Sequence, residues 1–197
     1  HAAASSPLKN KVVLITGASS GIGQSCAREL AQEGVVLVLC ARRLERLEEF
    51  REELLASNPE LKILCLSCDL RDEAEILNMF ATIRQGFGGV DVLVNNAGLG
   101  RKPELIGGDS EAWRNMLDVN VLALALCTRE AIADMQRQKK AGHVVHISSM
   151  SAHRVPPGGG FYSATKYAVR ALTEGLRQEL RALNSPIRIS AISPGYV

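Results

Sequence analysis

The stretch TGASSGIG, residues 16–23, joins a short apolar run, Val12 to Thr16, to a segment of helical periodicity, Gly21 to Gln32. Its glycines allow a tight turn and a close approach of backbone to ligand, while the free N–H groups and dipole of a helix start attract an anion. The alternative is a glycine-rich connection without a ligand. Because the turn follows a first strand and precedes a first helix, the pattern favours a pyrophosphate-binding site.

Outward from this turn, short β-branched or apolar runs alternate with longer helical patterns. The alternation predicts a doubly wound, mostly parallel sheet with helices on both faces, in one Rossmann-type domain spanning residues 1–197. The expected strands are Val12 to Thr16, Val35 to Cys40, Leu61 to Leu66, Val92 to Asn95, His143 to Ser148 and Ile187 to Ile192. The expected helices are Gly21 to Gln32, Leu44 to Ser57, Glu73 to Gln85, Ser110 to Gln138 and Phe161 to Ala182.

Composition narrows the classes of function. The 197 residues are 46% hydrophobic and 22% charged, and the net charge of +2 comes from intermixed acidic and basic residues. We therefore expect a soluble globular domain without the basic stripe of a nucleic-acid-binding protein. The longest apolar runs are too short to cross a bilayer.

The cysteines predict a reducing compartment, and hence a cytoplasmic protein. There are five, an odd number, and they lie inside apolar runs, where free cysteine packs as a small hydrophobe. Cys65 and Cys68 form a C-x-x-C pattern, but no second ligand pair follows, so we expect core packing and no metal. Residues 1–6 lack an initiator methionine and a signal-peptide pattern, and we interpret them as a processed end, an expression remnant or a disordered tail.

The end of the second expected strand bears on the choice of cofactor. An NAD enzyme places an acid there to bind the ribose 2′-hydroxyl, but this chain has Ala41 followed by Arg42 and Arg43. Arginine pairs with a 2′-phosphate through charge-assisted hydrogen bonds, so the sequence predicts NADP(H), with Arg42 the main contact. The alternative is a solvated first turn of helix.

The spacing Gly-x-x-x-Gly-x-Gly resembles the T-G-x-x-x-G-x-G signature of the short-chain dehydrogenase/reductase family. Further landmarks follow in the family's order: Asp69 after the third strand, Asn95-Asn96-Ala97-Gly98 after the fourth and Pro194-Gly195 after the sixth. The resemblance implies a cofactor site formed by Gly17, Ser19, Ser20, Gly21, Ile22, Gly23, Arg42, Arg43, Asp69, Leu70, Asn96, Ala97, Gly98, Tyr162, Lys166, Pro194 and Gly195.

Tyr162 and Lys166 are candidates for proton transfer. They stand four residues apart at the start of a helix, so they share a face, and a nearby ammonium favours the phenolate and makes tyrosine a usable general acid/base. Ser149, at the carboxyl end of the fifth strand, has a hydroxyl that can polarise a substrate carbonyl, and the resemblance selects it over Ser148. By the same resemblance, Asn120 is the fourth catalytic residue, holding a water that relays protons to Lys166.

Three longer stretches resemble the group of dehydrogenase/reductase SDR family member 11, which includes insect farnesol dehydrogenases and steroid-active reductases. They are residues 150–155, 161–169 and 172–180. The resemblance implies hydride transfer to or from an apolar ketone, aldehyde or alcohol of steroid, isoprenoid or retinoid type, in a homodimer or homotetramer. The loop from Leu99 to Gly107 and the loop after Ser149 are expected to wall the substrate pocket.

The chain departs from the family in stopping at Val197, where members continue with nicotinamide contacts, a substrate lid and a last strand. We expect these 197 residues alone to be a poor enzyme. Two alternatives remain: a non-catalytic NADP-binding or scaffold protein, disfavoured by the complete set of four catalytic candidates, and an NAD-dependent alcohol dehydrogenase, disfavoured by Ala41 and Arg42. The extended, sugar-epimerising branch is disfavoured because its spacing requires glycine in place of Ser20.

Overall fold

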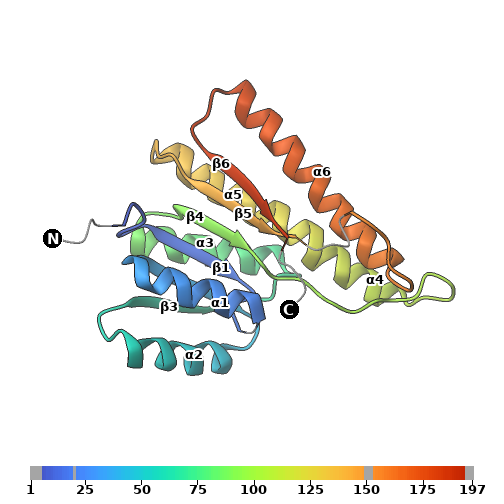
Figure 1. Ribbon diagram of the computed structural model, residues 1–197, viewed down its shortest axis with the longest axis horizontal. Helices are drawn as coiled ribbons and strands as arrows, with labels where there is room; N and C mark the ends of the chain where they lie inside the picture. Colours follow the sequence, from blue (N-terminus) through green and yellow to red (C-terminus); the bar gives the residue numbers. More distant parts are fainter. Residues whose placement is uncertain (1–5, 20, 149–152, 194–197) are drawn as a thin grey trace.

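Six parallel strands form the centre of the molecule, in the order β3-β2-β1-β4-β5-β6 (Figure 1). The computed structural model describes residues 6–19, 21–148 and 153–193. The strands are β1 (Val12–Thr16), β2 (Val36–Ala41), β3 (Lys62–Ser67), β4 (Val92–Asn95), β5 (His143–Ile147) and β6 (Arg188–Ile192). This arrangement confirms the predicted doubly wound sheet.

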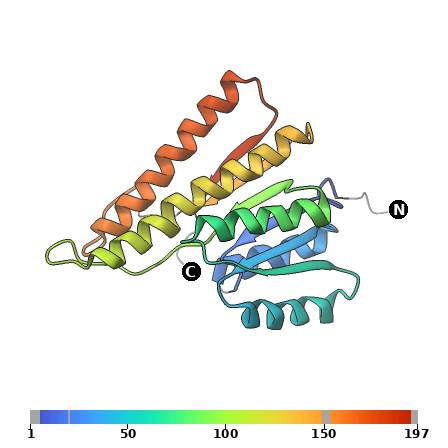
Figure 2. The same ribbon diagram turned by 180° about the vertical axis from the view of Figure 1, so that it is seen from behind.

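Helices cover both faces of the sheet (Figures 1 and 2). They are α1 (Gly21–Leu30), the short 3-10 turn η1 (Ala31–Glu33), α2 (Leu44–Ser57), α3 (Glu73–Phe87), α4 (Ser110–Leu117), the π-helical turn η2 (Asp118–Leu122), α5 (Ala123–Arg137) and α6 (Gly160–Ala182). In β1, Val13 and Ile15 belong to the core formed with α1 and α2, whereas Val12 and Leu14 belong to the core formed with α3, α5 and α6. Alternate residues of a buried strand thus serve opposite layers.

The order of the strands places a crevice beside β1. The chain leaves β1 toward β2 on one side and leaves β4 toward β5 on the other, so the two connections diverge at the carboxyl ends of these neighbouring strands. Such a switch point is where open α/β sheets bind ligands.

The expected helix from Ser110 to Gln138 is interrupted in the structure. The π-helical turn Asp118–Leu122 separates α4 from α5, and the N–H of Ala123 donates to the carbonyl of Asp118 five residues earlier. A π turn holds one more residue than an α turn and changes no side-chain chemistry, so hydrophobic periodicity does not reveal it.

The C-x-x-C pair lies on opposite faces of the sheet. Cys65 packs against the core under α1 and α2, while Cys68 is buried in the other core. Burial raises the pKa of Cys65 to about 11. Within the part of the chain that the structure describes, no group of three or more His, Cys, Asp or Glu residues is placed to hold a metal ion.

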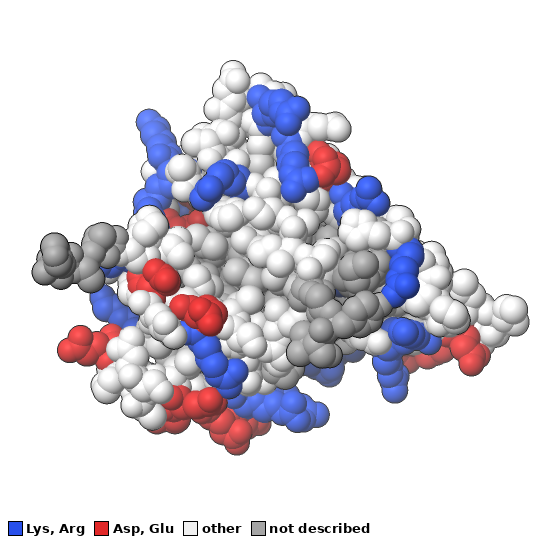
Figure 3. Space-filling view, in the orientation of Figure 1, with Lys and Arg blue, Asp and Glu red and all other residues white. Residues whose placement is uncertain are grey.

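The surface carries charges of both signs. On the face shown in Figure 3, acidic and basic side chains lie around the rim, and the centre is largely uncharged. Among residues 6–19, 21–148 and 153–193, no helix is long and apolar enough to span a bilayer.

A buried chain of polar groups links β4, α5, β5 and α6 through His146, which is 1% exposed. Asn95 donates to Thr128 Oγ1 at 2.9 Å, and this hydroxyl faces His146 Nε2 at 3.5 Å. On the other side, His146 Nδ1 lies 2.7 Å from Thr173 Oγ1, which donates to the carbonyl of Val169. The direction of these bonds suits a neutral imidazole that donates through Nδ1 and accepts through Nε2.

The buried hydrogen bonds of His146 predict that the free energy of unfolding falls in acid. Burial, with a smaller effect of Arg177, lowers the pKa of His146 from 6.5 to about 4. Because the unfolded chain takes up this proton first, the stabilisation is present above pH 6.5 and is lost as the pH falls toward 4, by roughly 3 kcal/mol. Urea unfolding of wild type and His146→Gln between pH 7.5 and 4 measures the effect. We expect a smaller loss in the variant, and parallel curves would contradict the assignment to His146.

Candidate active site

A buried hydroxyl holds the turn after β1 against the end of β4. Thr16 is 2% exposed, and its Oγ1 accepts the backbone N–H groups of Asn96 and Ala97, each at 3.1 Å. In return, Asn96 Nδ2 donates to the carbonyl of Gly17 at 3.0 Å. The two sides of the switch point are therefore fixed to each other, which makes the floor of the crevice rigid.

Two glycines of the turn leave no space for a side chain. A Cβ on Gly17 would lie 2.8 Å from Ala97 Cα, and one on Gly23 would lie 2.4 Å from the carbonyl oxygen of Gly17. Gly21 also needs its positive φ of 57°, but an added Cβ there would meet nothing within 4 Å. The turn is thus packed tightly behind and is open at the start of α1, where N–H groups can bind a phosphate.

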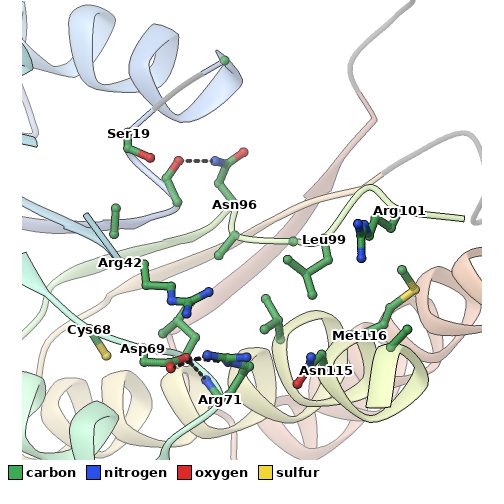
Figure 4. A pocket seen from close by; sticks show the side chains of 18 of the residues that line it. Ser19, Arg42, Cys68, Asp69, Arg71, Asn96, Leu99, Arg101, Asn115 and Met116 are labelled. Atoms are coloured by element: carbon green, nitrogen blue, oxygen red, sulfur yellow. Dashed lines mark hydrogen bonds and ion pairs between the residues drawn. The ribbon is translucent and has the colours of Figure 1, made fainter. Parts of the chain in front are cut away.

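A cavity of about 640 Å³ opens at the carboxyl ends of the strands (Figure 4). Many of the predicted cofactor residues line it: Gly17, Ser19, Gly21, Ile22, Arg42, Asp69, Leu70, Asn96, Ala97 and Gly98. Four others, Gly23, Arg43, Tyr162 and Lys166, are described but do not line this cavity. The predicted residues Ser20, Ser149, Pro194 and Gly195 lie outside the described residues. Arg43 is exposed and precedes the first turn of α2.

Charged side chains gather where β2 and β3 end. Arg71 reaches back to Asp69, with Nε 3.0 Å from Oδ1 and Nη2 2.8 Å from Oδ2. Figure 4 shows Arg42 beside this pair, on the side that faces the cavity. These hydrogen bonds from Arg71, with a weaker effect of Arg42, lower the pKa of Asp69 to about 2. Asp69 is therefore ionised and paired at neutral pH.

Lys166 lies beside Tyr162 on α6 and meets a third candidate, Asn120 of η2, next to Gly98. Lys166 Nζ lies 5.6 Å from the centre of the Tyr162 ring. A Cβ on Gly98 would lie 3.4 Å from Asn120 Oδ1 and 3.5 Å from Lys166 Nζ, so both polar groups border the same small space. Lys166 is 9% exposed, and burial lowers the pKa of its ammonium. A small residue at Gly98 keeps this space open.

The π-helical turn anchors Asn120, which is 1% exposed. Its Oδ1 accepts the N–H of Leu99 at 2.8 Å, and its Nδ2 donates to Thr165 Oγ1 at 3.2 Å. Thr165 in turn donates to the carbonyl of Tyr162 at 2.7 Å. Asn120 thus connects the segment after β4 to the first turns of α6, and π turns often occur where a helix presents a functional side chain.

An apolar groove of about 630 Å³ lies between the two expected pocket walls. Its lining comes from Pro103, Glu104, Leu105, Ile106, Val155, Pro156, Pro157, Gly158 and Gly160. Trp113 stacks on Phe161 with ring centres 5.5 Å apart, and its Nε1 donates to the carbonyl of Glu104 at 3.2 Å. The first wall is therefore held against α4 and the start of α6.

Comparison with known proteins places this arrangement in a family. The family model described as short chain dehydrogenase matches residues 11–197. The chain belongs to the short-chain dehydrogenase family. It is 48% identical to dehydrogenase/reductase SDR family member 11 of Bos taurus, over 96% of this chain and 75% of that protein. It is 43% identical to farnesol dehydrogenase of Aedes aegypti, over 95% of this chain and 77% of that protein.

Solved structures of the short-chain dehydrogenase family have the same fold. A metagenomic short-chain oxidoreductase in complex with NADP superimposes with a TM-score of 0.89 at 32% identity, over 96% of this chain and 84% of that one. A member from Burkholderia phymatum in complex with NAD gives a TM-score of 0.91 at 31% identity, over 96% and 67% of the two chains. The resemblance predicted from sequence motifs is confirmed at the level of the family and of the oxidoreductase fold.

Several residues with clear structural roles were missing from the candidates. Thr16 stands inside the glycine-rich stretch, and a polar residue that ends a buried strand was the available signal. Arg71 lies two residues after Asp69. An aspartate side chain often accepts a hydrogen bond from the backbone N–H two residues later, and that spacing was the available signal. Thr165 and Trp113 gave no signal, because their partners come from other parts of the chain.

Proposed function

We propose that this chain transfers a hydride between NADP(H) and the carbonyl or alcohol carbon of an apolar ketone, aldehyde or alcohol. The observation that carries the proposal is the placement of Lys166 and Asn120 at Gly98, which lines a cavity suited to a dinucleotide, with the Tyr162 ring beside Lys166. A buried ammonium beside a tyrosine favours proton exchange.

The residues present fit the cofactor. A Cβ on Gly17 or on Gly23 would clash with the backbone of this turn, and the open side of the turn at Gly21 suits a pyrophosphate. Arg42 would bind the 2′-phosphate, and Asp69 and Leu70 would border the adenine. The remaining proposed contacts are Ser19, Ser20, Ile22, Arg43, Asn96, Ala97, Gly98, Tyr162, Lys166, Pro194 and Gly195. When bound, the nicotinamide supplies the hydride chemistry.

Each proposed catalytic residue has a defined role. Tyr162 gives or takes the proton of the substrate oxygen, and Ser149 polarises the carbonyl by a hydrogen bond. Lys166 places its ammonium beside the Tyr162 ring and binds the nicotinamide ribose. Asn120 holds the segment at Leu99 in place and positions a water that relays protons to Lys166. The N–H of Ser148 donates to the carbonyl of Ile192 at 2.7 Å, which ties the end of β5 to β6.

An apolar substrate is supported by the groove between residues 103–106 and 155–160. Leu105, Ile106 and Val155 are 58%, 93% and 60% exposed there, so a steroid, isoprenoid or retinoid-like molecule would cover apolar surface. We also propose a homodimer or homotetramer in the cytoplasm. The apolar hollow between α5 and α6, which includes Leu124, Leu172 and Leu176, supports an oligomer. The free cysteines support a location in the cytoplasm.

The test is a substrate panel run on the native chain together with whatever residues follow Val197. NADPH absorbance would be followed with apolar ketones and aldehydes, with sugars and short polar ketones as the comparison set. We expect the apolar compounds to be turned over with higher kcat/KM. NADPH binding without turnover of any compound would favour a non-catalytic cofactor-binding protein.

The proposed cofactor preference predicts tighter binding of NADPH than of NADH, and a smaller difference in Arg42→Ala. Charge-assisted hydrogen bonds of this guanidinium to a 2′-phosphate are worth about 1.5–3 kcal/mol each. Fluorescence titration of both cofactors measures the difference. Arg46→Ala is the matched control, because Arg46 is exposed in the first turn of α2 and does not line the cavity. Equal or tighter binding of NADH by the wild type would refute the preference.

A further inference from the structure

At the end of the cavity formed by β2 and β3, the carboxylate of Asp69 and a bound phosphate would compete for Arg42. Arg42 and Asp69 both line this end, and the carboxylate of Asp69 is close enough to Arg42 for their charges to interact. Among the described residues that line the cavity, Asp69 carries the only carboxylate. An unpaired carboxylate in this position would repel a phosphate and would attract the guanidinium meant to bind it.

Arg71 donates three hydrogen bonds to this carboxylate. Its Nε and Nη2 bond to the two oxygens of Asp69 at 3.0 and 2.8 Å, and its own backbone N–H donates to Oδ1 at 3.0 Å. The two side chains are about one third exposed, at 32% and 27%, and both line the cavity. Glu111 and Asp118 are also near enough to Arg71 to interact electrostatically, but neither lines the cavity.

From this arrangement we infer that Arg71 is a determinant of cofactor specificity, which favours the 2′-phosphate by neutralising Asp69 and thereby leaving Arg42 available. The inference rests on the proposed NADP(H) preference. With Arg71 present, this end of the cavity carries more positive than negative charge. Without Arg71, Arg42 and Asp69 balance each other, and their attraction makes Arg42 a poorer partner for phosphate.

Two ligands that differ only in the 2′-phosphate isolate the effect. ADP-ribose and 2′-phospho-ADP-ribose contain the adenosine and pyrophosphate but no nicotinamide, so their affinities do not depend on turnover. The dissociation constant of ADP-ribose divided by that of 2′-phospho-ADP-ribose, both measured by isothermal titration calorimetry at one salt concentration, reports on the 2′-phosphate alone. A larger ratio means a stronger preference for the 2′-phosphate. Contacts of Asp69 or Arg71 with the adenine affect both ligands and cancel in the ratio.

Arg71→Ala should reduce this ratio by about tenfold or more, the effect of losing one charge-assisted interaction. Asp69→Asn added to Arg71→Ala should return the ratio toward the wild-type value, because no carboxylate is then left to compete for Arg42. Arg46→Ala removes an equal charge outside the cavity and should leave the ratio unchanged. Thermal unfolding of each variant establishes that it is folded, and Arg71→Lys, which keeps the charge, should lie between wild type and Arg71→Ala.

The outcomes separate the two proposals. If the wild type shows no preference for the 2′-phosphate, the NADP(H) proposal fails and the inference fails with it. If the wild type shows the preference and Arg71→Ala leaves the ratio unchanged, the role of Arg71 alone is refuted. If Arg71→Ala lowers the ratio and Asp69→Asn does not restore it, Arg71 contacts the phosphate directly, and neutralisation of Asp69 is refuted.

Discussion

Tyr162→Phe is expected to lower turnover by about 10²–10⁴-fold, the usual contribution of general acid/base catalysis, while NADPH binding stays largely intact. The phenyl ring keeps the shape of the site next to Lys166, but the proton that the substrate oxygen exchanges is gone. Turnover would be measured at saturating NADPH with the best substrate from the panel, and cofactor affinity by titration. A fall in kcat without a matching change in cofactor affinity is the expected pattern.

Tyr167→Phe is the matched control for this experiment. Tyr167 lies on the same helix, α6, but is 39% exposed, and we propose no part in catalysis for it. Its variant should keep the rate of the parent enzyme. If Tyr162→Phe also keeps most of that rate, Tyr162 does not act as the acid/base and the proposed mechanism is wrong.

The largest effect on stability is expected at Asp134, a carboxylate that is 0% exposed. It joins α5 to α3 and to the segment before β4, since it accepts from Arg84 Nε at 2.5 Å, Arg137 Nη2 at 2.9 Å and the N–H of Val90 at 2.9 Å. Asp134→Ala leaves the buried N–H of Val90 and the partly exposed guanidinium groups of Arg84 and Arg137 without their acceptor, and each lost hydrogen bond to the carboxylate costs about 1.5–3 kcal/mol of unfolding free energy.

Urea unfolding at neutral pH measures this cost. Glu53→Ala provides the comparison, because Glu53 pairs with Arg28 at 3.1 Å on the surface, where both side chains are about half exposed. That variant should lose about 1 kcal/mol or less. A loss of similar size in Asp134→Ala would mean that water or other groups replace the missing carboxylate.

The layers of the fold were predictable from hydrophobic patterning because strands buried on both faces read as short apolar runs. Two of the strands, β2 and β3, begin and end one residue later than expected, a shift within the uncertainty of any boundary. The π-helical turn was not predictable, since its residues keep the helical pattern on both sides. The pairing of Asp134 with Arg84 was also hidden, because it joins residues far apart in sequence and patterning reports only burial.

The candidate site was predictable where a short motif carries the geometry. The positions of Gly17 and Gly23 follow from the need for close backbone contact, and the sharing of one helix face by Tyr162 and Lys166 follows from their spacing. The pairing of Asp69 with Arg71 depends on how one side chain folds back over a turn. Such choices between partners are made by local geometry, which a linear pattern of charges leaves open.

The π-helical turn Asp118–Leu122 takes up one more residue than an α turn would. Because successive residues of an α-helix are about 100° apart around its axis, winding the same residues as a regular α-helix would rotate α5 against α4 by about that angle. Either Met116 would then leave the cavity or Met135 would leave the core, because Met116 on α4 lines the cavity and Met135 on α5 belongs to the core. The wide turn therefore keeps the two helical surfaces in phase despite the additional residue. The same residues wound as a regular α-helix could not present both surfaces correctly at once.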